Sequence, residues 1–300
     1  MRIGIFGGDT GGRTIDDVVA EARAAERDGF ASFALPQIFG LDAMGVLAII
    51  GREVPRIGLA TGVVPTYSRH PLTMAQQAFT VQVASGGRFT LGVGLSHQMV
   101  IENMFGLSFD KPLRHMREYL AVLMPLVTDG KADVDGDTIS THAAVDIAGR
   151  TEIPVLVAAL GPKMLELAGT VTAGTVTWMT GPATLANYTV PTITAAAERA
   201  GRPAPQIVTS LPICVTSDVD GARTRAAQDF QIYGFLPSYR AMLDREGAAG
   251  PADVAIAGDE ATVTKAIGEL ADAGVTEFVA SIFGKREERS ETRALLQSML

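Results

Sequence analysis

The sequence predicts a single (β/α)8 barrel, and three observations carry that prediction. Short apolar runs alternate with segments of helical periodicity along all 300 residues, and no long linker separates them. Eight such runs can be counted, which is the number of strands that closes this barrel. The runs are continuously apolar, as expected for parallel strands buried on both faces. A doubly wound open sheet gives similar local patterns, but the count of eight and the absence of a domain break favour the α/β (TIM) barrel.

Each expected strand ends in a loop that begins a helix. The first strand is followed by a glycine loop and then by Thr14, which has Asp17 in the capping-box position and so begins the first helix. Further helices begin at Asp42 and Pro71. The expected strands cover residues 2–6, 30–36, 57–64, 88–94, 153–159, 175–179, 206–215 and 277–283.

One segment interrupts this alternation. Residues 131–150 lie between the fourth helix and the fifth strand and read as an inserted hairpin, with Asp135-Gly136 as its turn. After the seventh strand, a helical region is expected over roughly 218–246 and a second helix over 259–274. We therefore expect one domain over residues 1–300, with the hairpin as an insertion.

The composition excludes several function classes. The chain has 25 basic and 33 acidic residues, a net charge of −8, and no dense basic patch, which argues against a nucleic-acid partner. Its longest uncharged apolar stretches, such as 43–51, are far shorter than the ~20 residues that span a bilayer, so no membrane partner is expected. Cys214 is the single cysteine and no metal-ligand spacing occurs. This is compatible with a reducing cytosol, and we expect a cytoplasmic protein.

On this fold the chemistry sits at the carboxyl ends of the strands, so those ends supply the candidate residues. After the third strand, Thr61-Gly62-Val63 contains a glycine that indicates a bulge or a close backbone approach to a ligand. After the fourth strand, Gly94, Ser96 and His97 follow one another closely. His97 is the only histidine directly at a strand end and is the candidate catalytic residue, although a lone histidine is more often structural. His70, next to Pro71, is expected to cap a helix or lie on the surface.

Three other strand ends contribute candidates for binding. Gln37 follows the second strand and offers a donor and an acceptor, or is an ordinary loop residue. After the fifth strand, the free N–H groups of a helix start and one ammonium group indicate a phosphate site, or simply a capped turn, over Ala159, Leu160, Gly161, Pro162 and Lys163. Trp178 ends the sixth strand, where its ring could stack on a flat ligand or fill the core.

No paired carboxylates, Ser-His-Asp order or metal-ligand set occurs among these ends. An enzyme without reactive side chains of its own usually borrows chemistry from a cofactor. Apolar strand ends with one phosphate turn suit a flavin-like ring system that carries one phosphate.

Taken together, the chain resembles the bacterial luciferase-like family of flavin and deazaflavin oxidoreductases, in particular the actinobacterial branch that uses coenzyme F420. The resemblance covers essentially the whole chain and depends on the order and spacing of its pieces. These are 35–42 (LPQIFGLD), 61–63 (TGV), 69–71 (RHP), 88–94 (RFTLGVG), 106–108 (GLS), 112–120 (PLRHMREYL) and 154–164 (PVLVAALGPKM).

The resemblance implies a homodimeric barrel with an insertion. It implies that Thr61-Gly62-Val63 forms a bulge behind the deazaflavin ring, sometimes with a non-proline cis peptide, and that Gly161-Pro162-Lys163 holds the cofactor phosphate. It also implies that Arg117 and Glu118 are structural. One departure stands out: the sugar-phosphate and alcohol dehydrogenases of the family have Asp-His after the second strand, where this chain has Pro36-Gln37.

We therefore expect a coenzyme F420-dependent oxidoreductase that transfers hydride between the deazaflavin C5 and a small organic substrate. His97 would be the proton donor, and Ser96 and Gln37 would be polar contacts. Two alternatives remain at this point: an FMN-dependent monooxygenase of the same family, and a family member that binds a cofactor or ligand without turnover.

Overall fold

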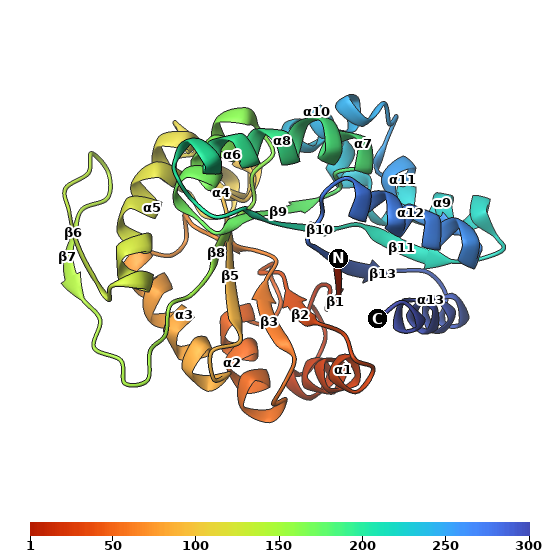
Figure 1. Ribbon diagram of the computed structural model, residues 1–300, viewed down its shortest axis with the longest axis horizontal. Helices are drawn as coiled ribbons and strands as arrows, with labels where there is room; N and C mark the ends of the chain where they lie inside the picture. The colour runs from red at the N-terminus through yellow and green to blue at the C-terminus, as the bar shows by residue number, and fades with distance from the viewer.

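The computed structural model describes residues 1–300 and contains a closed parallel barrel (Figure 1). The barrel closes because β1 pairs with β13, with Arg2 opposite Glu277 and Ile5 opposite Ala280. The order around the barrel is β1-β2-β3-β5-β8-β9-β10-β13, as the sequence predicts. The strands are β1 (Arg2–Phe6), β2 (Ser32–Leu35), β3 (Gly58–Thr61), β5 (Phe89–Gly94), β8 (Val155–Val157), β9 (Gly174–Trp178), β10 (Gln206–Ser210) and β13 (Glu277–Ile282).

Two expected strands are broken in the structure. The run over 57–64 is interrupted at Gly62 and Val63, so that β3 is followed by a separate two-residue strand, β4 (Val64–Pro65), which also pairs with β5. The run over 206–215 is interrupted at Leu211, and its second half is β11 (Pro212–Val215). β11 pairs with β13 and with a further strand, β12 (Ile256–Gly258), that the sequence reading did not predict. A strand of three residues is too short to show a periodicity.

Helices surround the barrel and lie between successive strands (Figure 1). Most begin where the sequence predicts, including α1 at the Thr14–Asp17 capping box. The region expected to be helical over 218–246 is divided, because α9 ends before a 3-10 turn, η2 (Gln231–Gly234), and α10 follows it. No helix is both long and apolar enough to cross a bilayer. The helices are α1 (Ile15–Arg27), α2 (Ala43–Glu53), α3 (Pro71–Ala84), α4 (Gln98–Asn103), α5 (Pro112–Thr128), α6 (Pro162–Val171), α7 (Pro182–Thr184), η1 (Leu185–Thr189), α8 (Val190–Arg199), α9 (Val219–Asp229), α10 (Pro237–Glu246), α11 (Pro251–Val254), α12 (Glu260–Asp272) and α13 (Arg286–Ser298).

The inserted hairpin is present and projects from the side of the barrel next to α5 (Figure 1). Its strands, β6 (Lys131–Val134) and β7 (Thr141–Ala144), are antiparallel, and Val134 lies opposite Thr141. The connecting loop is therefore 135–140, and the predicted two-residue turn at Asp135-Gly136 is wrong. Glu118 on α5 accepts hydrogen bonds from Thr138 and Ile139 and holds this longer loop, which agrees with the structural role expected of Glu118.

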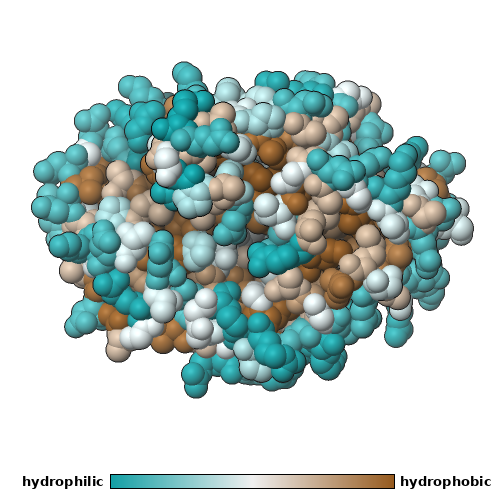
Figure 2. Space-filling view, viewed as in Figure 1, coloured by the Kyte–Doolittle hydropathy of each residue, from teal (hydrophilic) through white to brown (hydrophobic).

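The amino end of the barrel is closed by a polar cluster. The buried Glu277 accepts a hydrogen bond from the Ser32 hydroxyl and pairs with Arg2, so a carboxylate inside the barrel has a charged and a neutral partner. An added Cβ on Gly4 would lie 2.2 Å from Ser32 Oγ, which leaves no space there for a ligand. On the face seen in Figure 2, hydrophilic residues surround the rim and apolar ones gather nearer the centre. A site can therefore form at the carboxyl end of the barrel, opposite the polar cluster around Glu277.

Candidate functional site

The carboxyl ends of β3, β5 and β8 form a closely packed wall in which small residues alternate with larger neighbours. An added Cβ on Gly62 would lie 3.0 Å from Phe6 Cε2, so this glycine faces across the barrel toward β1. A Cβ on Gly94 would lie 2.8 Å from Val63 Cγ2 and 3.2 Å from Ala158 Cβ. Gly62 and Gly94 therefore give up the space of a side chain to Phe6 and Val63, which lets these strand ends approach one another closely.

The predicted bulge is real, and the peptide between Gly62 and Val63 is cis. Main-chain bonds hold it on both sides: the Gly62 N–H donates to the Leu35 carbonyl (2.8 Å), and the Gln37 N–H donates to the Val63 carbonyl (3.1 Å). The Thr61 hydroxyl donates to the Gly92 carbonyl and accepts from the Gly92 N–H, both at 2.8 Å. The Thr61 side chain is therefore fully occupied by β5 and cannot contact a cofactor through its hydroxyl.

The side chain of Gln37 is also engaged within the chain. Its Oε1 accepts from the Ala43 N–H at the start of α2 (2.9 Å) and lies 3.4 Å from Arg69 Nη2. Arg69 in turn pairs with Asp42, the N-cap of the same helix. Gln37 thus connects the bulge to α2, and its amide nitrogen, 3.5 Å from the Ile38 carbonyl, is the part least committed to other groups.

Ser96 and His97 follow β5 directly. Ser96 has a positive φ of 59°, which turns the chain away from the strand before α4. His97 is the N-cap of α4, but its side chain makes no capping bond, and neither its ring nitrogens nor the Ser96 hydroxyl bonds to another protein group. Burial lowers the pKa of His97, so its imidazole is mainly neutral at neutral pH.

Aromatic rings connect His97 to Trp178 across the mouth. Tyr239 of α10 lies against His97 (ring centroids 5.8 Å apart), and Tyr233 of η2 lies between Tyr239 (5.0 Å) and Trp178 (5.7 Å). Trp178 then stacks on Phe6 at 5.8 Å and 17°. We call these five residues the aromatic arc. The Nε1 atom of Trp178 is buried and makes no hydrogen bond of good geometry, although the Tyr233 hydroxyl lies near it, so an acceptor on a ligand would satisfy it better.

The sequence reading did not identify Phe6, Tyr233 or Tyr239. Phe6 is the last residue of a predicted strand, so its position at a strand end could have identified it as a candidate site residue. The two tyrosines lie in a region read as continuous helix, and nothing in the sequence places that region over the mouth.

The predicted phosphate turn lies at the rim, beside this wall. Ala159 is buried in the core, Leu160 is half-buried, and Gly161, Pro162 and Lys163 are exposed. Gly161 is the N-cap of α6, no side chain caps this helix, and its first turn contains no acidic residue. The Lys163 side chain faces a groove on the outside of the barrel between α5 and α6, which Arg117 and Arg199 also line. The structure thus brings the bulge, Gly94 and Gln37 together, connects His97 to Trp178, and leaves Lys163 apart from both groups.

Comparison with known proteins decides the family. The model of the luciferase-like monooxygenases matches residues 1–288. The chain belongs to this family. The match confirms the resemblance seen in the sequence and, with it, the oxidoreductase class.

Individual relatives of this luciferase-like protein agree in length and fold. It is 28% identical over 299 residues to a 5,10-methylenetetrahydromethanopterin reductase of Methanolobus tindarius, covering 90% of this chain and 91% of the relative. It is also 28% identical over 274 residues to a Mycobacterium tuberculosis protein assigned as a coenzyme F420-dependent oxidoreductase, covering 85% and 76%. The solved coenzyme F420-dependent tetrahydromethanopterin reductase of Methanopyrus kandleri superposes with a TM-score of 0.80 at 23% identity, covering 99% of this chain and 96% of that one.

Proposed function

We propose that this luciferase-like protein is a coenzyme F420-dependent oxidoreductase that transfers hydride between the deazaflavin C5 and a small organic substrate. The observation that carries the proposal is the similarity, over most of the chain, to a mycobacterial protein assigned the same cofactor. The mouth supports it, because its aromatic residues offer faces on which a planar ring can stack and the buried Nε1 of Trp178 lacks a partner there.

The residues at the mouth fit such a cofactor. Gly62, Val63 and Ala158 are half-buried at the strand ends, so a planar ring could lie against the part of this wall that stays exposed. The orphaned Nε1 of Trp178 would find an acceptor in a ring that carries carbonyl groups. At Gly161 an added Cβ would meet no atom within 4 Å, so the start of α6 is open to a phosphate.

When bound, the deazaflavin supplies the hydride-carrying carbon, and the protein supplies position and surroundings. The bulge at Gly62-Val63 and the stacked pair Phe6–Trp178 restrict where a ring can lie. Tyr233 and Tyr239, which connect Trp178 to His97, would add aromatic surface that excludes water from the ring. His97, with free ring nitrogens, can donate a hydrogen bond to the substrate at neutral pH, and a proton once it is charged.

The N–H groups at the start of α6 would hold the cofactor phosphate, with Lys163 adding long-range attraction from the outer groove. We also propose a homodimer, as the family resemblance implies, which light scattering on the purified protein would test.

Trp178 is the only tryptophan and lies in the mouth, so its fluorescence reports directly on the site. Titration with coenzyme F420 is expected to quench this fluorescence to saturation, and FMN is expected to do so more weakly. A screen of small electrophiles for oxidation of the reduced cofactor would then identify substrates. Saturable quenching by FMN with none by F420 would overturn the proposal.

That last outcome corresponds to the second candidate function, an FMN-dependent monooxygenase. The description of the family as luciferase-like monooxygenases favours it. Binding of either cofactor with no turnover across the screen would instead indicate a non-catalytic ligand-binding member.

A further inference from the structure

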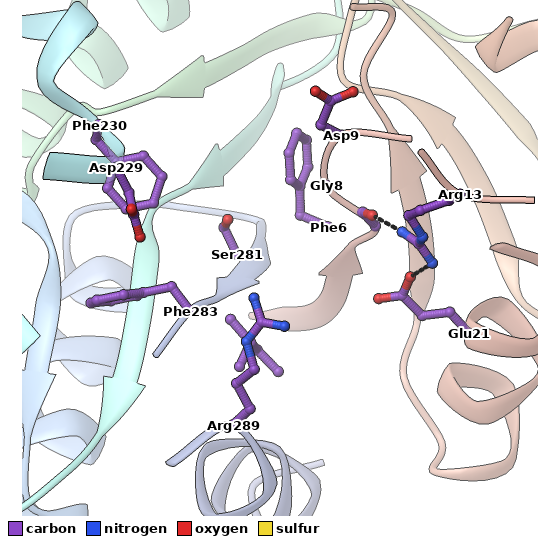
Figure 3. Close-up of a pocket in the computed structure, with 12 residues that line it drawn as sticks. Phe6, Gly8, Asp9, Arg13, Glu21, Asp229, Phe230, Ser281, Phe283 and Arg289 are labelled. Carbon is purple, nitrogen blue, oxygen red and sulfur yellow. Dashed lines mark hydrogen bonds and ion pairs between the residues drawn. The ribbon is translucent and has the colours of Figure 1, made fainter. Parts of the chain in front are cut away.

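A second cavity lies beside the aromatic arc, at the carboxyl ends of β1 and β13, which none of the predicted site residues lines. Its volume is about 630 Å³ (Figure 3). Phe6 belongs to both the arc and the lining of this cavity, so the cavity adjoins the mouth of the barrel. Phe6, Phe230, Ile282 and Phe283 are its apolar lining residues, and the others are glycines or polar and charged residues.

The glycine loop after β1 brings free main-chain donors to the cavity. Gly8 has a φ of +66°, and the N–H groups of Gly8 and Asp9 donate to no acceptor in the chain. Successive N–H groups in such a turn form a concave surface that favours anions. The Asp9 carboxylate does not fill this surface, because it accepts from the Gly11 N–H (3.0 Å) on its own loop.

The charged side chains of the cavity differ in what they are free to bind. Arg13 pairs with Glu21 at 2.6 Å and donates to the Gly7 carbonyl at 2.8 Å, so these two charges offset each other and steady the loop. Arg289 of α13 has no acceptor, and the Ser281 hydroxyl has no partner (Figure 3). Asp229, at the end of α9, is also unpaired and faces the cavity from the side of Phe230.

We propose that this cavity binds the acidic group, carboxylate or phosphate, of an aryl or similarly apolar substrate. The anion would be held by Arg289, the Ser281 hydroxyl and the N–H groups of the Gly8 loop, with the apolar body against the phenylalanines. Arg289 is then a specificity-determining residue, and the carboxylates of Asp9 and Asp229, which also line the cavity without a cationic partner, oppose binding by repulsion. That the bound acid is a substrate rests on the proposed function. That the cavity binds an anion does not depend on the proposed function.

The test uses phenyl phosphate and benzoate as anionic probes and benzyl alcohol as a neutral probe of similar size, measured by calorimetry on the full chain. The two acids are expected to bind more tightly than the alcohol. R289Q should weaken acid binding about tenfold or more, because a charge-assisted bond is lost. D229N should strengthen it, and R286Q should leave it unchanged, since Arg286 is exposed on the same helix but does not line the cavity.

Equal binding of acid and alcohol, or equal affinity in R289Q and R286Q, would overturn the site. Arg289 is exposed and unpaired, so R289Q should melt like the wild type. S281A gives an independent second variant, which should also lose affinity for the acids. The ratio of phenyl phosphate to benzoate affinity tells which acid the site prefers. Binding of the acids without any binding of F420 would contradict the proposed function and support the anion site. Binding of F420 without a preference for the acids would support the proposed function and contradict the anion site.

Discussion

At the scale of single residues, the hydroxyl of Thr61 takes the place of ladder bonds that the bulge removes. It is buried and makes both a donor and an acceptor bond to Gly92. Thr61→Val keeps the shape but leaves the buried N–H and carbonyl of Gly92 without a partner. We expect a loss of about 1–3 kcal/mol in the free energy of unfolding, measured in urea.

Thr61→Ser is the matched control, because it keeps the hydroxyl and removes only a methyl group. It should retain most of the stability that the valine variant loses. Equal stability of all three proteins would show that the bulge does not depend on this hydroxyl. The sequence assigned Thr61 to the cofactor from its position alone, and position does not reveal which partners a hydroxyl already has.

The role of His97 as a proton donor can be tested separately. His97→Gln should keep cofactor affinity and lose roughly 10²–10⁴-fold in turnover if the imidazole transfers a proton. Because burial lowers the pKa of His97, wild-type turnover should fall as the pH rises through a value below 6.5. His70→Gln is the control, since Nδ1 of His70 only caps α3 by accepting from the Leu72 N–H (3.2 Å). An unchanged pH profile in His97→Gln would refute the role.

At the scale of elements, the apolar runs predicted all eight barrel strands, since burial on both faces leaves a clear signal in composition. The breaks within two of them were not predicted: Gly62 pointed to a bulge, but nothing marked Leu211. The aromatic arc could not be predicted from the sequence, for a different reason. Tyr233 reaches Trp178 and Tyr239 reaches His97 because the helical region over 218–246 is divided. The tertiary packing that divides it leaves no local pattern in the sequence.

A side chain at Gly62 tests whether the bulge supports the cofactor ring. In Gly62→Ala the new Cβ would lie 3.0 Å from the Phe6 ring, which would have to shift relative to Trp178, on which it is stacked. We expect a cost of about 1–3 kcal/mol in cofactor binding or stability, together with a changed Trp178 emission. Gly268→Ala on α12 meets no atom within 4 Å and should leave both unchanged or gain stability. Identical emission and F420 affinity in Gly62→Ala would place the ring elsewhere.

The start of α6 is the second element with a testable role. Lys163 is exposed and faces the outer groove, so we expect Lys163→Ala to weaken cofactor binding modestly, by about 1 kcal/mol, and less at high salt. Lys265→Ala on α12, where the lysine pairs with Glu269 at 3.6 Å, is a control with the same change in net charge. An equal effect of both variants would mean that only the overall charge matters.

At the scale of the whole molecule, the mouth is assembled from the entire length of the chain. Phe6 and Ser281 come from its first and last strands, and the polar cluster around Glu277 joins these same strands at the opposite end. Opening at either end of the barrel should therefore disturb both the site and global stability. This coupling makes the pH dependence of unfolding informative about the site.

Two histidines near the mouth should set that dependence between pH 7.5 and 5.5. Burial lowers the pKa of both His97 and His115 relative to the unfolded chain, so the unfolded state binds more protons as the pH falls below about 6.5. The free energy of unfolding should then decrease over this window, whereas the carboxylates with lowered pKa values act mainly below it. His142 has the opposite sign, because a hydrogen bond with Asp133 raises its pKa. In urea titrations at the two pH values, His97→Gln should flatten the decrease and His142→Gln should steepen it; the reverse order would contradict the assignment of burial as the cause.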